Sequence, residues 1–285
     1  MGYNIVVCAK QVPDTKRITG DAMKEDGTVN RAALPAIFNP EDLNALETAL
    51  AVRDAHGGTV TVVTMGPPNA CEILRDSLCR GADKAILVSD RRAAASDTLA
   101  TSYILSQAVR KLNADLVFCG RQAIDGDTAQ VGPQMAEKLG FTLVTYLEEL
   151  INVGNDGIRV KRNVGNGWED VTAKLPALVT VLDTANTPRP YMSKRLMKFK
   201  KAKCALELAE GVCPDAMAEK GLLIDMWDLD ALECDMQWVG MAGSPTKVNR
   251  ILSVVLAGGD YEEFEPTEAG AAKLVSELIE EHTIG

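Results

Sequence analysis

The sequence predicts an α/β protein with a doubly wound, mostly parallel sheet. Two observations support this fold class. Short and nearly continuous apolar runs alternate with stretches of helical spacing through the first two-thirds of the chain. Such runs suit strands that are covered on both faces of a sheet, and strand–helix alternation is typical of βαβ units with parallel strands. The expected strands of this part are residues 4–9, 59–64, 85–88 and 116–119.

Four helices are expected after these strands. The first follows Asn39, a residue type that often caps helices, and it carries leucine and alanine at intervals of three or four. The fourth ends at Gly140, because glycine readily adopts the left-handed conformation that closes a helix. The expected helical ranges are 40–53, 69–80, 98–112 and 127–139.

The pattern changes after the fourth helix. Residues 142–150, 158–164 and 178–182 resemble strands, with Gly/Asn turns between them. Runs of this kind predict a β-hairpin that returns to the main sheet.

The last hundred residues lack the strand–helix alternation. Residues 194–203 are strongly basic, and residues 268–281 have the spacing of an amphipathic helix. We therefore expect two parts: an α/β nucleotide-binding domain over 1–192, and a basic docking segment with an extended C-terminal arm over 193–285.

Composition disfavours several classes of protein. The formal net charge of −10 disfavours nucleic-acid binding, because phosphate backbones would be repelled. No apolar run approaches the roughly 20 residues that span a bilayer, and the N-terminus leads directly into an expected strand, so we expect a cytoplasmic protein without membrane insertion. The 7 cysteines include no C-x-x-C pair and there are only 2 histidines, which gives little basis for a disulfide framework, a metal site or a catalytic triad.

Ligands of open parallel sheets bind beyond the carboxyl ends of the strands. The most informative segment there is 120–132, where a glycine-containing loop leads into a helix expected to begin near Asp127 or Thr128. The free N–H groups and the dipole of a helix start favour an anion, and Gly126 and Gly132 let phosphates approach the backbone. Plain N-capping by Asp127 is the alternative explanation.

Two common nucleotide fingerprints are missing from the sequence. Neither G-x-x-x-x-G-K-[ST] nor a G-x-G-x-x-G after the first strand occurs, so a nucleotide must be held in another way. Asn39-Pro40-Glu41-Asp42 is a second candidate, although helix-start preferences also explain it. The basic run is either a solvated face or, because it includes Leu196, Met197 and Phe199, a docking segment.

Taken together, the motifs resemble the beta subunit of electron transfer flavoproteins over nearly the whole chain. Residues 120–132 (GRQAIDGDTAQVG) look like the family signature, and 39–42, 65–67 and 175–189 resemble further family segments. The resemblance implies an adenine nucleotide-binding fold of the universal-stress-protein type. It also implies no catalytic residues in this chain, and an alpha-subunit partner that carries the electron-transferring FAD.

Within this family the sequence is most similar to the electron-bifurcating branch, on K-Q-V-P-D-T at 10–15, G-T-V-N-R at 27–31, N-P-E-D at 39–42 and G-S-P-T-K-V at 243–248. That branch implies a second FAD that takes hydride from NADH. One electron then goes to the alpha-subunit FAD, towards an acyl-CoA dehydrogenase-type partner, and the other to ferredoxin or flavodoxin. NADH-dependent oxidoreductase activity would belong only to the complex. The alternatives are a non-bifurcating carrier that holds structural AMP, and a stand-alone nucleotide sensor like universal stress proteins.

The resemblance also implies which residues contact the cofactor, with the diphosphate on the helix start at 127–132. Ser193 stands where the family presents an apolar anchor to the dehydrogenase, so either Met192 or Leu196 replaces it or the redox partner differs. The implied cofactor contacts are Cys8, Ala9, Asn39, Asp42, Met65, Gly66, Asp97, Thr98, Thr101, Ile124, Asp125, Gly126, Asp127, Thr128, Ala129, Gln130, Val131, Gly132 and Gln134.

Overall fold

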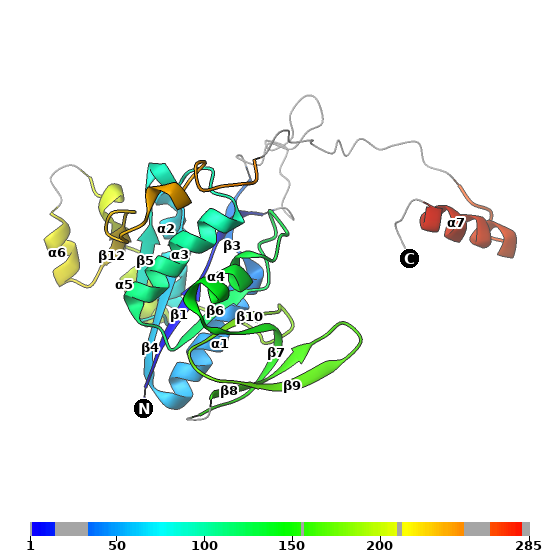
Figure 1. The fold of residues 1–285 in the computed structure, drawn as a ribbon, viewed down its shortest axis with the longest axis horizontal. Coiled ribbons are helices and arrows are strands. Elements are labelled where there is room, and N and C mark those ends of the chain that lie inside the picture. The colour runs from blue at the N-terminus through cyan, green and yellow to red at the C-terminus, as the bar shows by residue number, and fades with distance from the viewer. Residues whose placement is uncertain (1, 15–33, 155–156, 210–212, 248–262, 281–285) are drawn as a thin grey trace. The chain divides into compact units, whose positions relative to one another are not determined.

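The computed structural model describes residues 2–14, 34–154, 157–209, 213–247 and 263–280 (Figure 1). The chain divides into two compact units: one comprises residues 1–16 and 35–249, and the other comprises residues 17–34 and 250–285. The first unit holds the sheet. In the second, the structure describes the helix α7, Glu268–Glu280, close to the expected range 268–281. The family-like segment 27–31, together with Thr15 and Val248 of two others, lies outside the described residues.

A 10-stranded sheet forms the centre of the first unit, in the order β11-β12-β5-β4-β1-β6-β10-β7-β8-β9. The strands are parallel from β11 to β7, and then β8 pairs antiparallel with β7 and β9 antiparallel with β8. A separate antiparallel pair joins β2 (Gln11–Pro13) to β3 (Ala36–Phe38). The strands of the large sheet are β1 Tyr3–Cys8, β4 Gly58–Met65, β5 Lys84–Val88, β6 Leu116–Gly120, β7 Thr142–Gly154, β8 Gly157–Asn163, β9 Trp168–Ala173, β10 Ala177–Val181, β11 Lys203–Cys204 and β12 Leu223–Trp227.

Helices cover both faces of this sheet. On one face, α1 (Pro40–His56) and α2 (Cys71–Arg80) pack against the larger apolar cluster. On the other face, α3 (Thr98–Leu112) and α4 (Val131–Leu139) pack against a second cluster. The doubly wound α/β fold is therefore confirmed. The remaining helices are α5 Ser193–Phe199 and α6 Pro214–Glu219, with short 3-10 turns at Pro68–Ala70, Arg91–Ala93, Ala205–Glu207 and Met236–Trp238.

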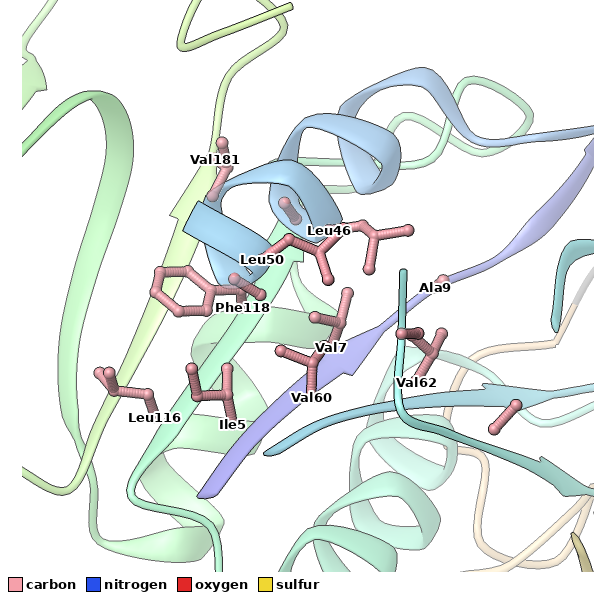
Figure 2. Close-up of a cluster of buried hydrophobic side chains, with 14 of the residues drawn as sticks. Ile5, Val7, Ala9, Leu46, Leu50, Val60, Val62, Leu116, Phe118 and Val181 are labelled. Atoms are coloured by element: carbon pink, nitrogen blue, oxygen red, sulfur yellow. The ribbon is translucent and has the colours of Figure 1, made fainter. Parts of the chain in front are cut away.

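The alternation of side chains along β1 explains its continuous apolar run. Ile5 and Val7 point to the α1 face, where Leu46, Leu50 and Phe118 surround them (Figure 2). Val6 and Cys8 belong to the cluster on the opposite face. Since a strand presents successive residues to opposite sides, a strand covered on both sides must be apolar at every position.

Several elements differ from the sequence-based expectation. The strand β9 was not expected, because its residues (WEDVTA) are largely exposed and polar and so give no apolar run. It extends the expected hairpin to three antiparallel strands. The strands β11 and β12, which lie beyond the division expected at residue 192, join the central sheet next to β5. Only 2 residues of β11 pair, so its sequence pattern is too short to recognise.

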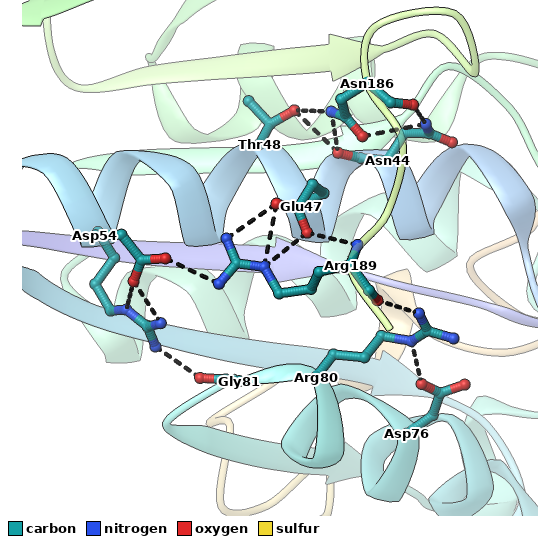
Figure 3. A network of polar contacts seen from close by, with 10 residues as sticks. Asn44, Glu47, Thr48, Asp54, Asp76, Arg80, Gly81, Asn186 and Arg189 are labelled. Carbon is teal, nitrogen blue, oxygen red and sulfur yellow. Dashed lines mark hydrogen bonds and ion pairs between the residues drawn. The ribbon is translucent and has the colours of Figure 1, made fainter. Parts of the chain in front are cut away.

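Arg189 binds the segment after β10 to α1 (Figure 3). Its guanidinium donates to Glu47 at 2.8 Å and 2.9 Å and to Asp54 at 2.8 Å, and its backbone N–H donates to Glu47 at 2.9 Å. Next to this group, Asn186 donates to Thr48 Oγ1 at 2.9 Å and Asn44 donates to the carbonyl of Asn186 at 2.7 Å. The contacts fix the chain that leads from the sheet towards α5.

Arg189→Lys is expected to lower the free energy of unfolding by about 1–2 kcal/mol, because lysine cannot donate to both carboxylates in this fork geometry. Urea unfolding of the full chain measures the loss. Arg159→Lys is the matched control: its pair with Asp170 is about half exposed (55% and 52%), so the same change there should cost less than about 0.5 kcal/mol. Equal losses in the two variants would contradict the role given to Arg189.

Candidate functional site

The candidate site lies at the carboxyl ends of β1 and β6, which are neighbours in the sheet. The connection that leaves β1 leads to β4 on one side of it, and the chain later crosses to β6 on its other side. Successive connections therefore leave in opposite directions, which opens a crevice at this point of a parallel sheet. The helix α1 borders the crevice on one face and α4 borders it on the other.

Asp42, in the first turn of α1, bridges the two strand ends. Its Oδ2 accepts a hydrogen bond from the Lys10 N–H at 2.8 Å, and its Oδ1 accepts one from the Gly120 N–H at 2.8 Å. A Cβ on Gly120 would lie 2.6 Å from that Oδ1, so only glycine permits this approach. Burial raises the pKa of Asp42 to about 7, and the two N–H donors oppose the rise. Asp42 therefore joins the ends of β1 and β6 through its two hydrogen bonds.

Asn39 and Glu41 hold the loop that follows β6. Asn39 donates to the carbonyl of Gln122 at 2.8 Å and accepts from the Ile124 N–H at 3.1 Å. Glu41 accepts from the Gln122 N–H at 2.8 Å and pairs with Arg121 at 3.0 Å. The side chain of Asn39 does not cap α1, contrary to the expectation. Glu41 is not among the expected cofactor contacts, and its anchoring of this loop has no mark in the sequence because its partners come from a distant segment.

The loop itself turns back twice before the helix starts. Asp127 and Ala129 have φ angles of 47° and 52°, in the left-handed region. These turns use up residues 127–130, so α4 begins at Val131 and not at Asp127, and its N-cap is Gln130. The expected helix start near Asp127 or Thr128 is wrong, and so is the alternative in which Asp127 caps the helix. Asp127 instead accepts from the side chain of Gln122 at 3.0 Å.

The backbone N–H groups at the start of α4 are available to a ligand. Ala129 in the left-handed and Gln130 in the right-handed conformation form a concave pair of the kind that binds anions. Among the described residues, no acceptor lies on the N–H groups of Thr128, Val131 or Gly132. The positive end of the helix dipole adds to the preference for an anion.

Gly132 sets how closely α4 approaches the sheet. A Cβ at this position would lie 2.9 Å from Cys119 Sγ and 3.0 Å from Thr180 Cγ2. A Cβ on Gly126, by contrast, would meet nothing within 4 Å. Of these two glycines, Gly132 is thus required by packing, whereas Gly126 leaves open space above the loop.

The start of α3 lies beside the start of α4. Thr98 donates to the side chain of Gln130 at 2.8 Å, and Ser102 donates to that of Gln134 at 3.1 Å. The carboxylate of Asp97 caps α3 through the Leu99 and Ala100 N–H groups, at 2.9 Å and 3.1 Å. Gln134 also donates to the hydroxyl of Thr98 at 3.4 Å, so these two side chains lie beside each other.

A C-terminal segment completes this side of the site. The other oxygen of Asp97 accepts from the hydroxyl of Thr246 at 2.6 Å and from its N–H at 3.0 Å. Ser244 Oγ accepts from the Asp97 N–H at 2.9 Å. Both residues belong to the family-like segment 243–248, but no sequence pattern indicates that they contact α3. The Asp97 carboxylate is engaged within the chain, so its role here is to fix these elements.

The remaining expected contacts lie at the same end of the sheet. Cys8 and Ala9 are buried at the end of β1, where burial, with Asp42 nearby, raises the pKa of the Cys8 thiol to about 12. Met65 and Gly66 follow at the end of β4 and are partly exposed. Thr101 is partly exposed in the first turns of α3. The raised pKa favours the neutral thiol form of Cys8.

Lys10, which follows β1, and Asp125, in the loop after β6, form an ion pair at 2.7 Å. Two hollows lie elsewhere: one of about 440 Å³ near Arg110, Asp115 and Pro176, and one of about 640 Å³ between α1, α2 and α5. The first hollow lies at the amino ends of the strands, opposite to the candidate site, since Asp115 and Pro176 directly precede β6 and β10. We assign the site to the crevice because the free N–H groups and the converging polar side chains lie there.

The basic segment forms α5, which buries none of its residues. The N–H of Met192 donates to the carbonyl of Cys79 at 3.1 Å, and Arg195 donates to the carbonyl of Leu78 at 2.7 Å, so α5 is attached to α2. Met192 and Met197 are exposed apolar side chains, whereas Leu196 lines the larger hollow. Among the described helices, none is long and apolar enough to cross a membrane.

Comparison with known proteins gives consistent matches. The family model described as "Electron transfer flavoprotein domain" matches residues 26–206. The electron transfer flavoprotein subunit beta of Clostridium acetobutylicum is 42% identical over 283 residues, which cover 99% of this chain and 100% of that protein. Subunit CarD of the caffeyl-CoA reductase-Etf complex of Acetobacterium woodii is 41% identical, covering 98% and 99% of the two chains. Protein FixA of Azorhizobium caulinodans is 40% identical, covering 95% and 93%. The chain therefore belongs to the family of electron transfer flavoprotein beta subunits.

Proposed function

We propose that this electron-transfer subunit binds a second FAD in the crevice and works in a complex with an alpha subunit. The observation that carries the proposal is the start of α4, where the N–H groups of Thr128, Val131 and Gly132 have no acceptor among the described residues. A dinucleotide's diphosphate is an anion of the right kind for such a group of donors. The motif resemblance and the relative from the caffeyl-CoA reductase-Etf complex favour the bifurcating branch.

The residues of the crevice fit an FAD adenylate half. Thr128, Val131 and Gly132 would offer N–H donors to the diphosphate, and the space above Gly126 would let the phosphates approach. The carboxylate of Asp125 is paired with Lys10, which reduces repulsion of an anion. When bound, the flavin would supply the redox chemistry between NADH and one-electron acceptors.

The chain's own residues have positioning roles in this proposal. Asn39, Glu41 and Asp42 hold the loop to the strand ends, so the N–H donors are oriented before the ligand arrives. Preorganised donors bind an anion without the entropy cost of ordering a loop. Asp97 and Thr246 fix the C-terminal segment on the neighbouring helix start in the same way.

Three kinds of partner follow from the proposal. The alpha subunit would pack against apolar surface such as Leu274, Val275 and Ile279, which α7 exposes. An acyl-CoA dehydrogenase-type enzyme would contact α5, where the exposed Met192 and Met197 accompany basic side chains. Ferredoxin or flavodoxin would take the low-potential electron.

Co-expression with the alpha subunit, followed by flavin quantitation and an anaerobic NADH titration, tests the proposal. We expect 2 FAD per heterodimer and bleaching of flavin absorbance by NADH, one FAD being the alpha subunit's own. A heterodimer with a single FAD and extractable AMP would sink the bifurcating proposal and leave the simple carrier. A nucleotide-loaded homodimer that ignores the alpha subunit would instead indicate a stand-alone sensor.

A further inference from the structure

Two buried cysteines meet between α2 and the edge of the sheet. Cys71 is the first residue of α2, and Cys204 is the last residue of the edge strand β11. Both residues are fully buried. Their sulfur atoms and a carboxylate oxygen of Glu207 all lie within 4.8 Å of one another. The two thiols are therefore neighbours, although long stretches of chain separate them.

The third member of this group is already occupied. Both oxygens of Glu207 accept from Arg75, at 2.8 Å and 3.0 Å, and one of them also accepts from the Cys204 N–H at 3.1 Å. A metal ion would have to compete with the Arg75 cation for this carboxylate and would have only two sulfur ligands without it. The arrangement thus favours chemistry between the two sulfurs over metal binding.

Only partly buried side chains cover the Cys71–Cys204 pair. Arg75 and Glu207 retain about one-fifth of their side-chain exposure (21% and 22%). Among the strands that the structure describes, β11 pairs with β12 alone and through 2 residues, so its opening needs few broken hydrogen bonds. Cys8 and Cys119 are also cross-strand neighbours, but they lie on β1 and β6, each of which is paired on both sides. Their strands cannot open without disrupting the central sheet.

We propose that Cys71 and Cys204 are a redox-active pair that forms a reversible intrachain disulfide with a peroxide oxidant. One thiolate attacks a peroxide oxygen and gives a sulfenic acid and water. The second thiol then displaces the hydroxyl as a second water, so two thiols and H₂O₂ become a disulfide and two waters. The two electrons pass from the sulfur atoms to the peroxide.

The reaction is slow compared with that of an activated thiol. Burial raises the pKa of Cys71, with Cys204 adding to the rise, so the thiolate forms only when the edge opens. Once formed, the bond would tie β11 to α2. Because Lys203 is the last residue of the basic segment 194–203 and belongs to β11, the carboxyl end of that segment would be fixed to α2 as well. This proposal does not depend on which nucleotide fills the crevice.

Thiol mapping of the full chain tests the proposal. The reduced protein is treated with excess hydrogen peroxide under native conditions, then denatured and alkylated. We expect 5 of the 7 cysteines to stay reduced and to be alkylated, and mass spectrometry to detect a disulfide-linked Cys71–Cys204 peptide. All 7 thiols should be recovered after treatment with dithiothreitol. The melting temperature should rise by roughly 5–15 °C, because the cross-link restricts the unfolded chain.

Variants separate this pair from other thiols. Cys71→Ser and Cys204→Ser should each abolish the peptide and the melting shift, whereas Cys213→Ser, at an exposed cysteine, should leave both unchanged. Continued alkylation of Cys71 and Cys204 in the wild-type chain would overturn the proposal without any variant. A disulfide between other cysteines would also overturn it. So would stoichiometric zinc that protects both thiols and is lost in Cys71→Ser.

Discussion

Asp42→Ala is expected to lower the free energy of unfolding by about 2–5 kcal/mol and to weaken retention of the nucleotide. The substitution leaves the N–H groups of Lys10 and Gly120 buried without their acceptor, and each such group costs about 1–3 kcal/mol. The ends of β1 and β6 would no longer be joined through α1, so the loop after β6 would lose its position. Urea unfolding of the full chain measures the stability.

Asp125→Ala is the matched control for this substitution. It removes one carboxylate at the same site, but the partner of Asp125 is the half-exposed Lys10 (50%), so the loss should stay below about 1 kcal/mol. Similar losses of unfolding free energy in the two variants would contradict the role of Asp42 in joining the ends of β1 and β6.

The stability difference between wild type and Asp42→Ala should also depend on pH. Burial raises the pKa of Asp42 from 3.8 to about 7 in the folded state. Between about pH 4 and 7 the folded chain therefore holds a proton that the unfolded chain has released, so wild-type stability falls as the pH rises. The fall is at most about 1.4 kcal/mol per pH unit. The variant lacks this contribution, so the difference should shrink across the window. A difference that grows with pH would contradict the raised pKa.

Gly132→Ala is expected to weaken nucleotide binding by about tenfold or more and to destabilise the chain by about 1–3 kcal/mol. The new methyl group would meet Cys119 Sγ at 2.9 Å and Thr180 Cγ2 at 3.0 Å, so the start of α4 must move away from the sheet. The N–H donors would move with it. Alanine otherwise favours a helix over glycine by about 1 kcal/mol, so any loss measures the clash.

Gly126→Ala provides the comparison, because its methyl group would meet nothing within 4 Å and its stability should be unchanged. Thermal unfolding and nucleotide titration of both variants, each co-expressed with the alpha subunit, give the two readouts. If Gly132→Ala unfolds and binds as the wild type does, the close approach of α4 is not needed for the site.

The sequence predicted elements well where local patterns reflect burial. The strands β1, β4, β5 and β6 are covered on both faces, so each is a run of apolar residues that can be recognised without any partner. Prediction from the sequence failed where an element is not buried or is too short to produce an apolar pattern. The exposed β9 has no apolar run, and β11 pairs through too few residues to carry a pattern. The expected start of α4 was too early because no residue pattern in the sequence reveals the left-handed turns at Asp127 and Ala129.

The sequence by itself determined the fold class and the family, because apolar periodicity and the 120–132 motif are local and survive without coordinates. The tertiary structure decided what the motif residues do. Asn39, Glu41, Asp42 and Asp97 were candidates or ordinary helix-start residues in the sequence, and the folded chain uses their side chains to hold its own backbone. In the proposed function, the N–H groups of Thr128, Val131 and Gly132, which have no acceptor among the described residues, bind the ligand. Such roles depend on which distant donors approach each carboxylate or amide, and only the packing of α1, α3 and α4 on the sheet determines this.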